Sequence, residues 1–461
     1  MKFFDVQDRI TIMLTSRLTV VGAGLAGCEA AWQAAESGVN VLLFEMRPLK
    51  NTEAHRTDML AELVCSNSLR SEEITTGPGL LKKEMEAASS LVMQAARESS
   101  VAAGSALAVD RDIFAGLITE KISSHPRIKV LRQELDAIPE GLVVIATGPL
   151  TSQSMTGELA KTIGSNSLYF YDAIAPIIDA ESINMTEVFC ASRYGKGGDD
   201  YINCPMNREE YEAFYSALMD ADTAQLRDFE NIKVFEGCMP VEVMARRGVD
   251  TLRFGPLKPV GLKDPATGKT PYAVVQLRQE NRQKTAYNMV GFQTRLRQPE
   301  QRRVFRMIPG LSNVEFLRYG SMHRNTFINS PMLLNSDLSL KTMPDVYVAG
   351  QLAGVEGYIE SAAMGFIAGI NASRRLVGLE AAAPSHLTAH GALISHITTT
   401  DPAIFQPSNI NFGLIEQHPD AAAIRDKKKK RLKMVDIALR DWSEYIYKIL
   451  PSAKIRVEKD G

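Results

Sequence analysis

The sequence predicts an α/β protein, in which a parallel-sheet domain is interrupted by a smaller α+β domain. A glycine-rich turn at residues 22–27 joins a buried strand to a helix close to the N-terminus. Two later apolar strands, 142–145 and 345–349, also end in glycine. The chain between about residues 190 and 325 differs, with short alternating strands and many arginines. Because strands far apart in the chain are predicted to share one sheet, the segment between them must be inserted into it.

The first strand, 18–21, is short and apolar, as in strands buried on both faces. It leads into glycines spaced G-x-G-x-x-G and a helix at 25–36. This arrangement gives a tight turn, close approach of a pyrophosphate, and a helix N-terminus directed at the phosphates. A strand at 39–44 is followed by Glu45, whose carboxylate can accept hydrogen bonds from a ribose. The sequence therefore predicts a Rossmann-type dinucleotide site, with the turn formed by Gly22, Ala23, Gly24, Leu25, Ala26 and Gly27.

The two later strands extend this site. The strand at 142–145 ends in Ala-Thr-Gly148, which flavoproteins of the two-dinucleotide kind often place beside the cofactor; the alternative is an ordinary buried strand. The strand at 345–349 leads into Gly350 and Gln351, where many FAD proteins carry an acid instead of glutamine. We therefore predict an FAD-binding domain. The chain holds no second G-x-G-x-x-G motif, so a separate nicotinamide-binding domain is not expected.

The rest of the chain is predicted as helices at 80–98, 110–123 and 359–374, a strand at 128–131, an extended segment at 405–414 and a basic helix from 427. The predicted organisation is a possible N-terminal extension at 1–15, the first part of the FAD-binding domain at 16–190, an insertion domain at 191–328, and the second part of the FAD-binding domain, with the basic helix, at 329–450.

Composition restricts the function classes. The chain has 461 residues and a net charge of −2, which argues against a protein that binds nucleic acid over its whole surface. Its 5 cysteines form no C-x-x-C pair, so neither disulfides nor a zinc site is predicted, and a reducing, cytoplasmic setting fits best. No signal peptide or membrane-spanning stretch is expected.

Histidines and basic clusters remain. His386 and His390 are spaced i, i+4 but lack further ligands, so we expect solvated or capping histidines and no metal. Four basic clusters suggest local positive patches suited to phosphate backbones. They are Arg246–Arg247, Arg295 with Arg297, Arg302–Arg303 with Arg306, and Lys427 to Lys433.

Two cysteines are candidate nucleophiles. Cys238 is predicted on a turn between Gly237 and Pro240, where a thiolate can attack an electron-poor carbon; the alternative is a packed free cysteine. Cys65, followed by small polar residues, faces the same alternatives. We expect packing roles for Cys28 and Cys190, and Cys204 is ambiguous.

Together, five motifs resemble those of the folate- and FAD-dependent tRNA uracil-5-methyltransferase family. The resemblance extends from Leu18 to the 405–414 segment, and the two cysteine motifs and the last motif are the most discriminating. The motifs lie at 22–27, Ala61 to Arg70, Phe235 to Glu242, Gly255 to Gly261 and Ala349 to Ser361.

The resemblance implies methylation of the T-loop uridine of tRNA, at position 54, with carbon from 5,10-methylenetetrahydrofolate and electrons from NADPH or NADH through FAD. It implies that Cys238 adds to C6 of the uracil, that Cys65 assists proton removal or protects the site, and that Tyr358 stacks near the flavin. Gln351 agrees with this family. The alternatives are the same chemistry on a ribosomal RNA uridine, or a non-catalytic FAD-containing RNA-binding factor with inert cysteines.

Overall fold

The computed structural model describes residues 17–52, 54–164, 167–224 and 239–449, with only the backbone described at 167–173 and 322–324. Its larger domain is built on a five-stranded sheet with the order β16-β7-β1-β2-β6, in which every neighbouring pair is parallel. The strands come from three distant parts of the chain, which confirms the predicted α/β fold class. In sheet order they are Val346–Val348, Val143–Ile145, Arg17–Val21, Asn40–Glu45 and Ile128–Arg132.

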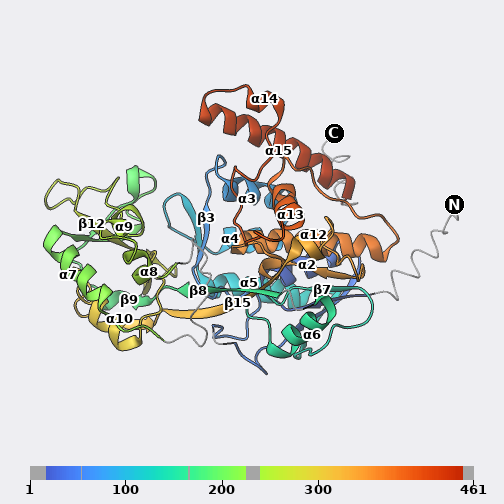
Figure 1. Cartoon of the computed structure of the whole chain (residues 1–461), viewed down its shortest axis with the longest axis horizontal. Coiled ribbons are helices and arrows are strands. Elements are labelled where there is room, and N and C mark those ends of the chain that lie inside the picture. The colour runs from blue at the N-terminus through green and yellow to red at the C-terminus, as the bar shows by residue number, and fades with distance from the viewer. Residues whose placement is uncertain (1–16, 53, 165–166, 225–238, 450–461) are drawn as a thin grey trace.

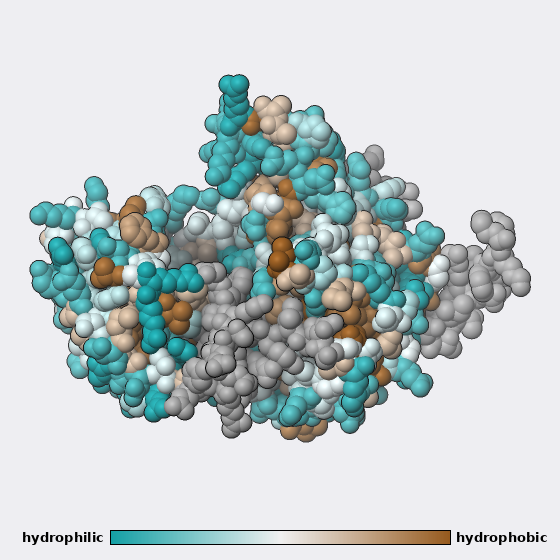
Figure 2. All heavy atoms as spheres, in the orientation of Figure 1, coloured by the Kyte–Doolittle hydropathy of each residue, from teal (hydrophilic) through white to brown (hydrophobic). Residues whose placement is uncertain are grey.

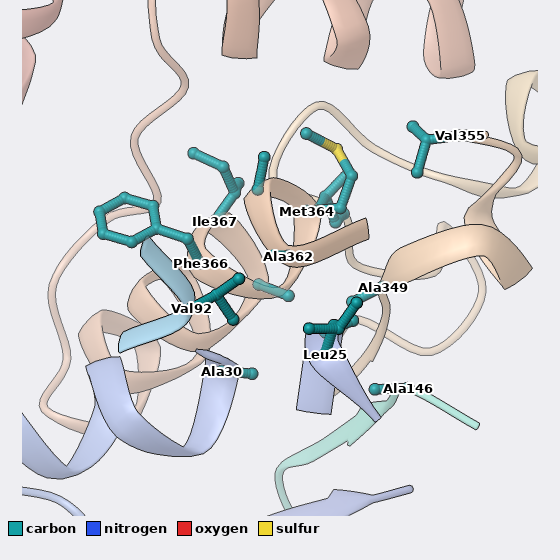
Figure 3. Close-up of a cluster of buried hydrophobic side chains, with 14 of the residues drawn as sticks. Leu25, Ala30, Val92, Ala146, Ala349, Val355, Ala362, Met364, Phe366 and Ile367 are labelled. Carbon is teal, nitrogen blue, oxygen red and sulfur yellow. The ribbon is translucent and has the colours of Figure 1, made fainter. Parts of the chain in front are cut away.

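Two helices pack closely on this sheet and against each other (Figure 1). They are α2, Leu25–Glu36, and α12, Tyr358–Leu376. A Cβ atom on Gly365 would lie 2.1 Å from the carbonyl oxygen of Ala26, and one on Gly369 would lie 2.5 Å from that of Ala30. The helices therefore approach so closely that only glycine fits on the α12 side. Figure 3 shows side chains of the surrounding core, which range from Ala30 and Ala362 to Phe366 and Ile367.

The single helix predicted at 80–98 is wrong, because the chain forms α3, Gly77–Ala87, and α4, Leu91–Glu98. The break lies at Ser89, where φ is +57°, and Ser90 then caps α4 by accepting a hydrogen bond from the Met93 N–H. The buried Glu29 carboxylate accepts hydrogen bonds from the Ser90 hydroxyl, at 2.8 Å, and from the Val92 N–H, at 3.0 Å. Apolar periodicity continues across the break, so the pattern alone did not reveal it.

The smaller domain contains a six-stranded antiparallel sheet, with the order β10-β11-β12-β13-β9-β14. Two of its strands, β9 and β10, precede residue 191, where the sequence placed the start of the insertion. In sheet order the strands are Phe189–Cys190, Tyr201–Met206, Ala273–Gln279, Ala286–Met289, Ile177–Asp179 and Phe316–Arg318. A long antiparallel pair, β8 (Ser167–Ile174) and β15 (Ser321–Ile328), runs between the two domains (Figure 1).

The central strand β12 is buried at every residue, whereas the sequence predicted alternating strands here. One face packs into the core formed with α7 (Arg208–Met219) and α10 (Gln298–Phe305). On the other face, Val274 packs with Phe189 and Leu262. Because both faces of the strand are buried, its residues do not alternate between buried and solvent-exposed positions.

The C-terminal helix α15, Lys427–Ile449, lies across the top of the larger domain as seen in Figure 1. The buried Trp442 donates a hydrogen bond to the Glu84 carbonyl, at 2.6 Å, and stacks on His390 with ring centroids 4.0 Å apart. His390 is fully buried and its Nδ1 lies 2.7 Å from Glu84 Oε2, so the expectation of a solvated or capping histidine is wrong for this residue. Trp442 and His390 thus anchor the basic helix to the larger domain.

The remaining elements complete the two domains. None of the helices in the described parts of the chain has both the length and the apolar character that a membrane span requires. The remaining strands and α-helices are β3 (Ser68–Ser71), β4 (Ser100–Val101), β5 (Ala106–Val109), α5 (Arg111–Ser124), α6 (Gln153–Ile163), α8 (Val241–Ala245), α9 (Thr251–Phe254), α11 (Ser330–Leu333), α13 (Ala389–Thr399) and α14 (Pro419–Ala422).

Candidate active site

A groove opens at the carboxyl ends of β1, β2 and β7, the place where open α/β sheets bind ligands. We call it the dinucleotide groove. Of the residues predicted for this site, all but Gly27 line it. These are Gly22, Ala23, Gly24, Leu25, Ala26, Glu45, Gly148, Gly350, Gln351 and Tyr358.

The three glycines of the turn differ in their surroundings. Gly22 has φ of +96°, and a Cβ there would lie 2.6 Å from the Ala146 carbonyl oxygen. A Cβ on Gly27 would lie 1.8 Å from the Gly22 carbonyl oxygen, so this residue packs beneath the groove. A Cβ on Gly24 would meet no atom within 4 Å. The space beside Gly24 belongs to the groove, where a ligand can approach the main chain.

Glu45 lines the groove and also holds the glycine turn. Its Oε2 accepts a hydrogen bond from the Ala23 N–H, at 3.0 Å, and its Oε1 accepts from the backbone and side chain of Arg47. Burial alone would raise the pKa of Glu45, but the hydrogen bonds and charge of Arg47 outweigh it and hold the pKa below its ordinary value. The carboxylate therefore stays charged at the end of β2.

Arg47, Thr52 and His55 also line the groove. They were not predicted as site residues, although they lie in the polar stretch after Glu45. Buried Arg47 also pairs with Glu62 at 3.0 Å. His55 lies in the same groove wall, with Nδ1 at 2.6 Å from the Thr52 hydroxyl. Burial and the charge of Arg47 lower the pKa of His55 to about 4, so the groove presents a neutral imidazole. The polar composition was the only signal for these residues.

A second cavity adjoins the groove, and we call it the cysteine pocket. Its lining includes Cys65, Arg70 and Glu360. Val64, Pro149, Leu150, Gln351 and Tyr358 line both cavities. A molecule in the pocket therefore meets the same wall as a ligand in the groove.

The loop that carries Cys65 is held from several elements. The Cys65 N–H donates to the Tyr358 hydroxyl of α12, at 2.8 Å. Arg111 of α5 donates to the Cys65 carbonyl, at 2.8 Å, and Arg278 of β12 donates to the Ser66 hydroxyl, also at 2.8 Å. The smaller domain thus contacts the thiol-bearing loop directly. Neither arginine was predicted, because their approach to Cys65 depends on tertiary structure.

Glu360 is a charged residue in the lining of the pocket. Its Oε1 accepts a hydrogen bond from the Ile410 N–H, at 3.2 Å, and lies 3.6 Å from Arg70. Burial raises the pKa of Glu360, although Arg70 acts in the opposite direction. Asn409, in the predicted extended segment, accepts a hydrogen bond from Arg70 at 2.9 Å. The C-terminal segment therefore completes this wall.

The other cysteines are placed differently. Cys238 lies outside the described residues, and the chain resumes at buried Met239 just before α8. Cys28 and Cys204 are fully buried, and burial raises the pKa of both thiols, which suits packing rather than reactivity. Cys190, expected to be packed, is instead exposed at the edge strand β10.

A parallel sheet with a glycine turn, a ligand groove at its carboxyl edge and an inserted antiparallel domain define the class of two-domain, dinucleotide-binding α/β proteins. The family model "Glucose inhibited division protein A" matches residues 17–380. Structurally, the chain is similar to GidA of Aquifex aeolicus, with a TM-score of 0.67 at 16% identity over 96% of this chain and 76% of that one. That similarity concerns the fold.

Curated relatives are closer in sequence. The methylenetetrahydrofolate--tRNA-(uracil-5-)-methyltransferase TrmFO of Pelotomaculum thermopropionicum is 58% identical over 91% of this chain and 97% of its own length. Those of Acetivibrio thermocellus and Geobacter sulfurreducens are each 55% identical over 94% of this chain and 99% of their own length. The chain belongs to this methyltransferase family, as its motifs predicted.

Proposed function

We propose that the chain transfers a one-carbon unit from 5,10-methylenetetrahydrofolate to C5 of a tRNA uridine, using FAD and a reduced nicotinamide nucleotide. The observation that carries this proposal is the pair of adjoining cavities. One contains the glycine turn, the other contains Cys65, and Gln351 and Tyr358 form part of their common wall. Because the two cavities share these residues, a cofactor bound in the groove would lie next to a base bound in the pocket.

The groove fits FAD. The open space beside Gly24 and the N-terminus of α2 suit the pyrophosphate, and Glu45 suits a ribose. Gly148, Gly350 and Gln351 continue the groove toward the pocket, where the flavin ring would lie beside Tyr358. Bound FAD supplies two-electron redox chemistry at this position.

The residues of the chain would carry the remaining steps. The Cys238 thiolate adds to C6 of the uracil, and the electron pair of the C5–C6 bond makes C5 a nucleophile toward the one-carbon unit. Once C5 has bonded to the one-carbon unit, Cys65 takes the C5 proton and the bond between the methylene and its carrier breaks, which leaves an exocyclic methylene on C5. A hydride equivalent then adds to this carbon, and the C6–S bond breaks to restore the ring and release the Cys238 thiolate. The transferred methylene is at the oxidation level of formaldehyde, so two electrons are needed to form the methyl group. NADH or NADPH supplies them.

The finer target that we propose is the T-loop uridine at position 54. A strongly basic surface supports RNA as the partner. Lys427 to Lys430 occupy the first turn of α15, where their charges oppose the helix dipole and repel one another. None of the ion pairs between described residues involves these lysines. Figure 2 shows the hydrophilic end of the α14–α15 region projecting above the molecule. A phosphate backbone would supply the missing negative charge.

Methyl transfer from isotopically labelled methylenetetrahydrofolate tests this function. The purified yellow protein is incubated with labelled folate, NADH or NADPH, and either tRNA, tRNA with cytidine at position 54, or a ribosomal RNA fragment. Nuclease digestion and mass spectrometry should find labelled 5-methyluridine only in the unaltered tRNA. Cys238→Ala should retain flavin and lose the product. Label in ribosomal RNA alone, or in no RNA, would contradict the proposal.

A further inference from the structure

Arg278 is an unusual buried cation. It lies on β12 of the smaller domain and is 7% exposed. Its guanidinium donates to Asn67 Oδ1, at 2.9 Å, and to the Ser66 hydroxyl, at 2.8 Å, both of which are neutral groups. Among the described residues, no carboxylate lies within ion-pair distance of it. Glu280 acts on Arg278 electrostatically but pairs directly with Arg111, so an anion in contact with the buried Arg278 guanidinium would stabilise the structure.

The neighbouring Arg111 shows the contrast. It holds the same loop through the Cys65 carbonyl, but its Nε pairs with Glu280 at 2.5 Å. Arg318 of β14 adds a third guanidinium, which contacts the carbonyl of Ala54 in the pocket lining. Burial and the charge of Arg111 lower the pKa of Arg318, whereas Tyr358 and Cys65 act in the opposite direction. Arg111 and Arg278 therefore hold the Cys65 loop directly, and Arg318 adds a third positive charge. Among the described residues, Glu280 is the one carboxylate paired with any of the three.

We propose that Arg278 is a positioning residue that holds Cys65 as a thiolate, the anion that balances its buried charge. Cys65 precedes Ser66 directly, and it lines the pocket beside Tyr358. The inference deepens the proposed function and rests on it for the role of Cys65. A thiolate is the form that can accept the C5 proton, after which the thiol returns that proton to solvent.

The electrostatics of the loop agree with this arrangement. Burial lowers the pKa of Arg278, whereas Glu280, Tyr201 and Cys65 act in the opposite direction. The charged and titratable groups that line the cysteine pocket or act on Cys65 and its arginines are Arg70 of β3, Arg111 of α5, Tyr201 of β11, Arg278 of β12, Glu280 just after β12, Arg318 of β14, Glu356 just before α12, and Tyr358 and Glu360 of α12. Cations predominate on the side of the smaller domain, so that domain controls the state of the thiol.

Alkylation of the cysteines as a function of pH tests the proposal without methyl transfer. The intact flavoprotein is treated with iodoacetamide between pH 5 and 9, and peptide mass spectrometry follows Cys65 and, as internal reference, exposed Cys190. In the unaltered protein, the midpoint for Cys65 should lie at least one pH unit below the ordinary thiol value of about 8.5. Arg278→Gln should raise this midpoint by about one unit, a roughly tenfold loss of reactivity at low pH. Arg278→Lys should stay close to the unaltered protein, and Cys190 should not change.

Several outcomes would overturn the inference. An ordinary Cys65 midpoint in the unaltered protein would do so, even if Arg278→Gln fails to fold. Equal shifts in Arg278→Gln and Arg278→Lys, with the flavin spectrum and melting temperature retained, would show that loop geometry matters and charge does not. If tRNA is methylated while Cys65 titrates normally, this inference alone is wrong. If Cys65 shifts as expected but no RNA is methylated, the proposed function alone is wrong.

Discussion

The dinucleotide groove and the cysteine pocket share a wall but are built in different ways. The groove is built around a local sequence motif, the glycine turn, and the carboxyl ends of β1 and β7. The cysteine pocket depends on long side chains, with Arg111 and Arg278 reaching the Cys65 loop from different domains. Turns that bring main chain to a ligand leave local motifs in a sequence. Sites made by distant side chains leave none.

A single substitution in the glycine turn should abolish flavin binding in the groove. Gly24→Val should give colourless protein with near-normal melting, because its side chain enters open groove space that the pyrophosphate would occupy. The visible flavin spectrum and the melting temperature measure the two effects.

Gly27→Val is the matched control. Its Cβ would lie 1.8 Å from the Gly22 carbonyl oxygen, so this variant should lose the fold together with the flavin. Full flavin occupancy in Gly24→Val would contradict the assignment of the groove.

The ion pair between Arg111 and Glu280 should stabilise the loop that carries Cys65. Arg111→Met leaves buried Glu280 without its partner, which should cost about 3 kcal/mol of stability. Adding Glu280→Gln should restore part of that loss, because the unpaired charge is then removed. Thermal melting of the two single variants and the double variant measures this coupling. Strictly additive losses would mean that the pair does not support the loop.

The basic end of α15 tests a third region, which lies outside both cavities. Replacing Lys427, Lys428, Lys429 and Lys430 with Gln should weaken tRNA binding about tenfold and flatten its salt dependence, since fewer counterions are released. Flavin content should not change.

Arg302→Gln with Arg303→Gln provides the comparison. Arg303 pairs with Glu300, and Arg302 contacts the Tyr319 ring, so less free charge is removed and the effect should be smaller. Equal effects in the two variants would mean that ion pairing does not distinguish these patches.

The smallest effect concerns pH at the groove. The folded-state pKa of His55 is about 4, below its ordinary value of 6.5, so the unfolded chain binds more protons between these values. Stability should therefore rise with pH across this window and fall on acidification. In His55→Gln this part of the loss should disappear, a difference of a few degrees in melting temperature at pH 5. Exposed His386→Gln is the control, and identical acid profiles in all three proteins would contradict the effect.

The sequence predicted the elements whose signals are local. The glycine turn, the helix at 25–36 and the glycine-ended strands lie where expected, and the motifs identified the family that the comparisons confirm. It missed the break at Ser89, because apolar periodicity continues through it. It also missed Arg47, Arg111 and Arg278, since a buried arginine resembles a surface arginine until its partners are known.

The most direct test of the account is covalent trapping with tRNA that carries 5-fluorouridine at position 54. Thiolate addition to C6 followed by bond formation at C5 leaves fluorine where the departing proton would be, so the enzyme cannot be released. The account predicts an adduct that survives denaturation, maps to Cys238 and disappears in Cys238→Ala while flavin remains bound. An adduct that persists in Cys238→Ala and disappears in Cys65→Ala would contradict the roles assigned to the two thiols.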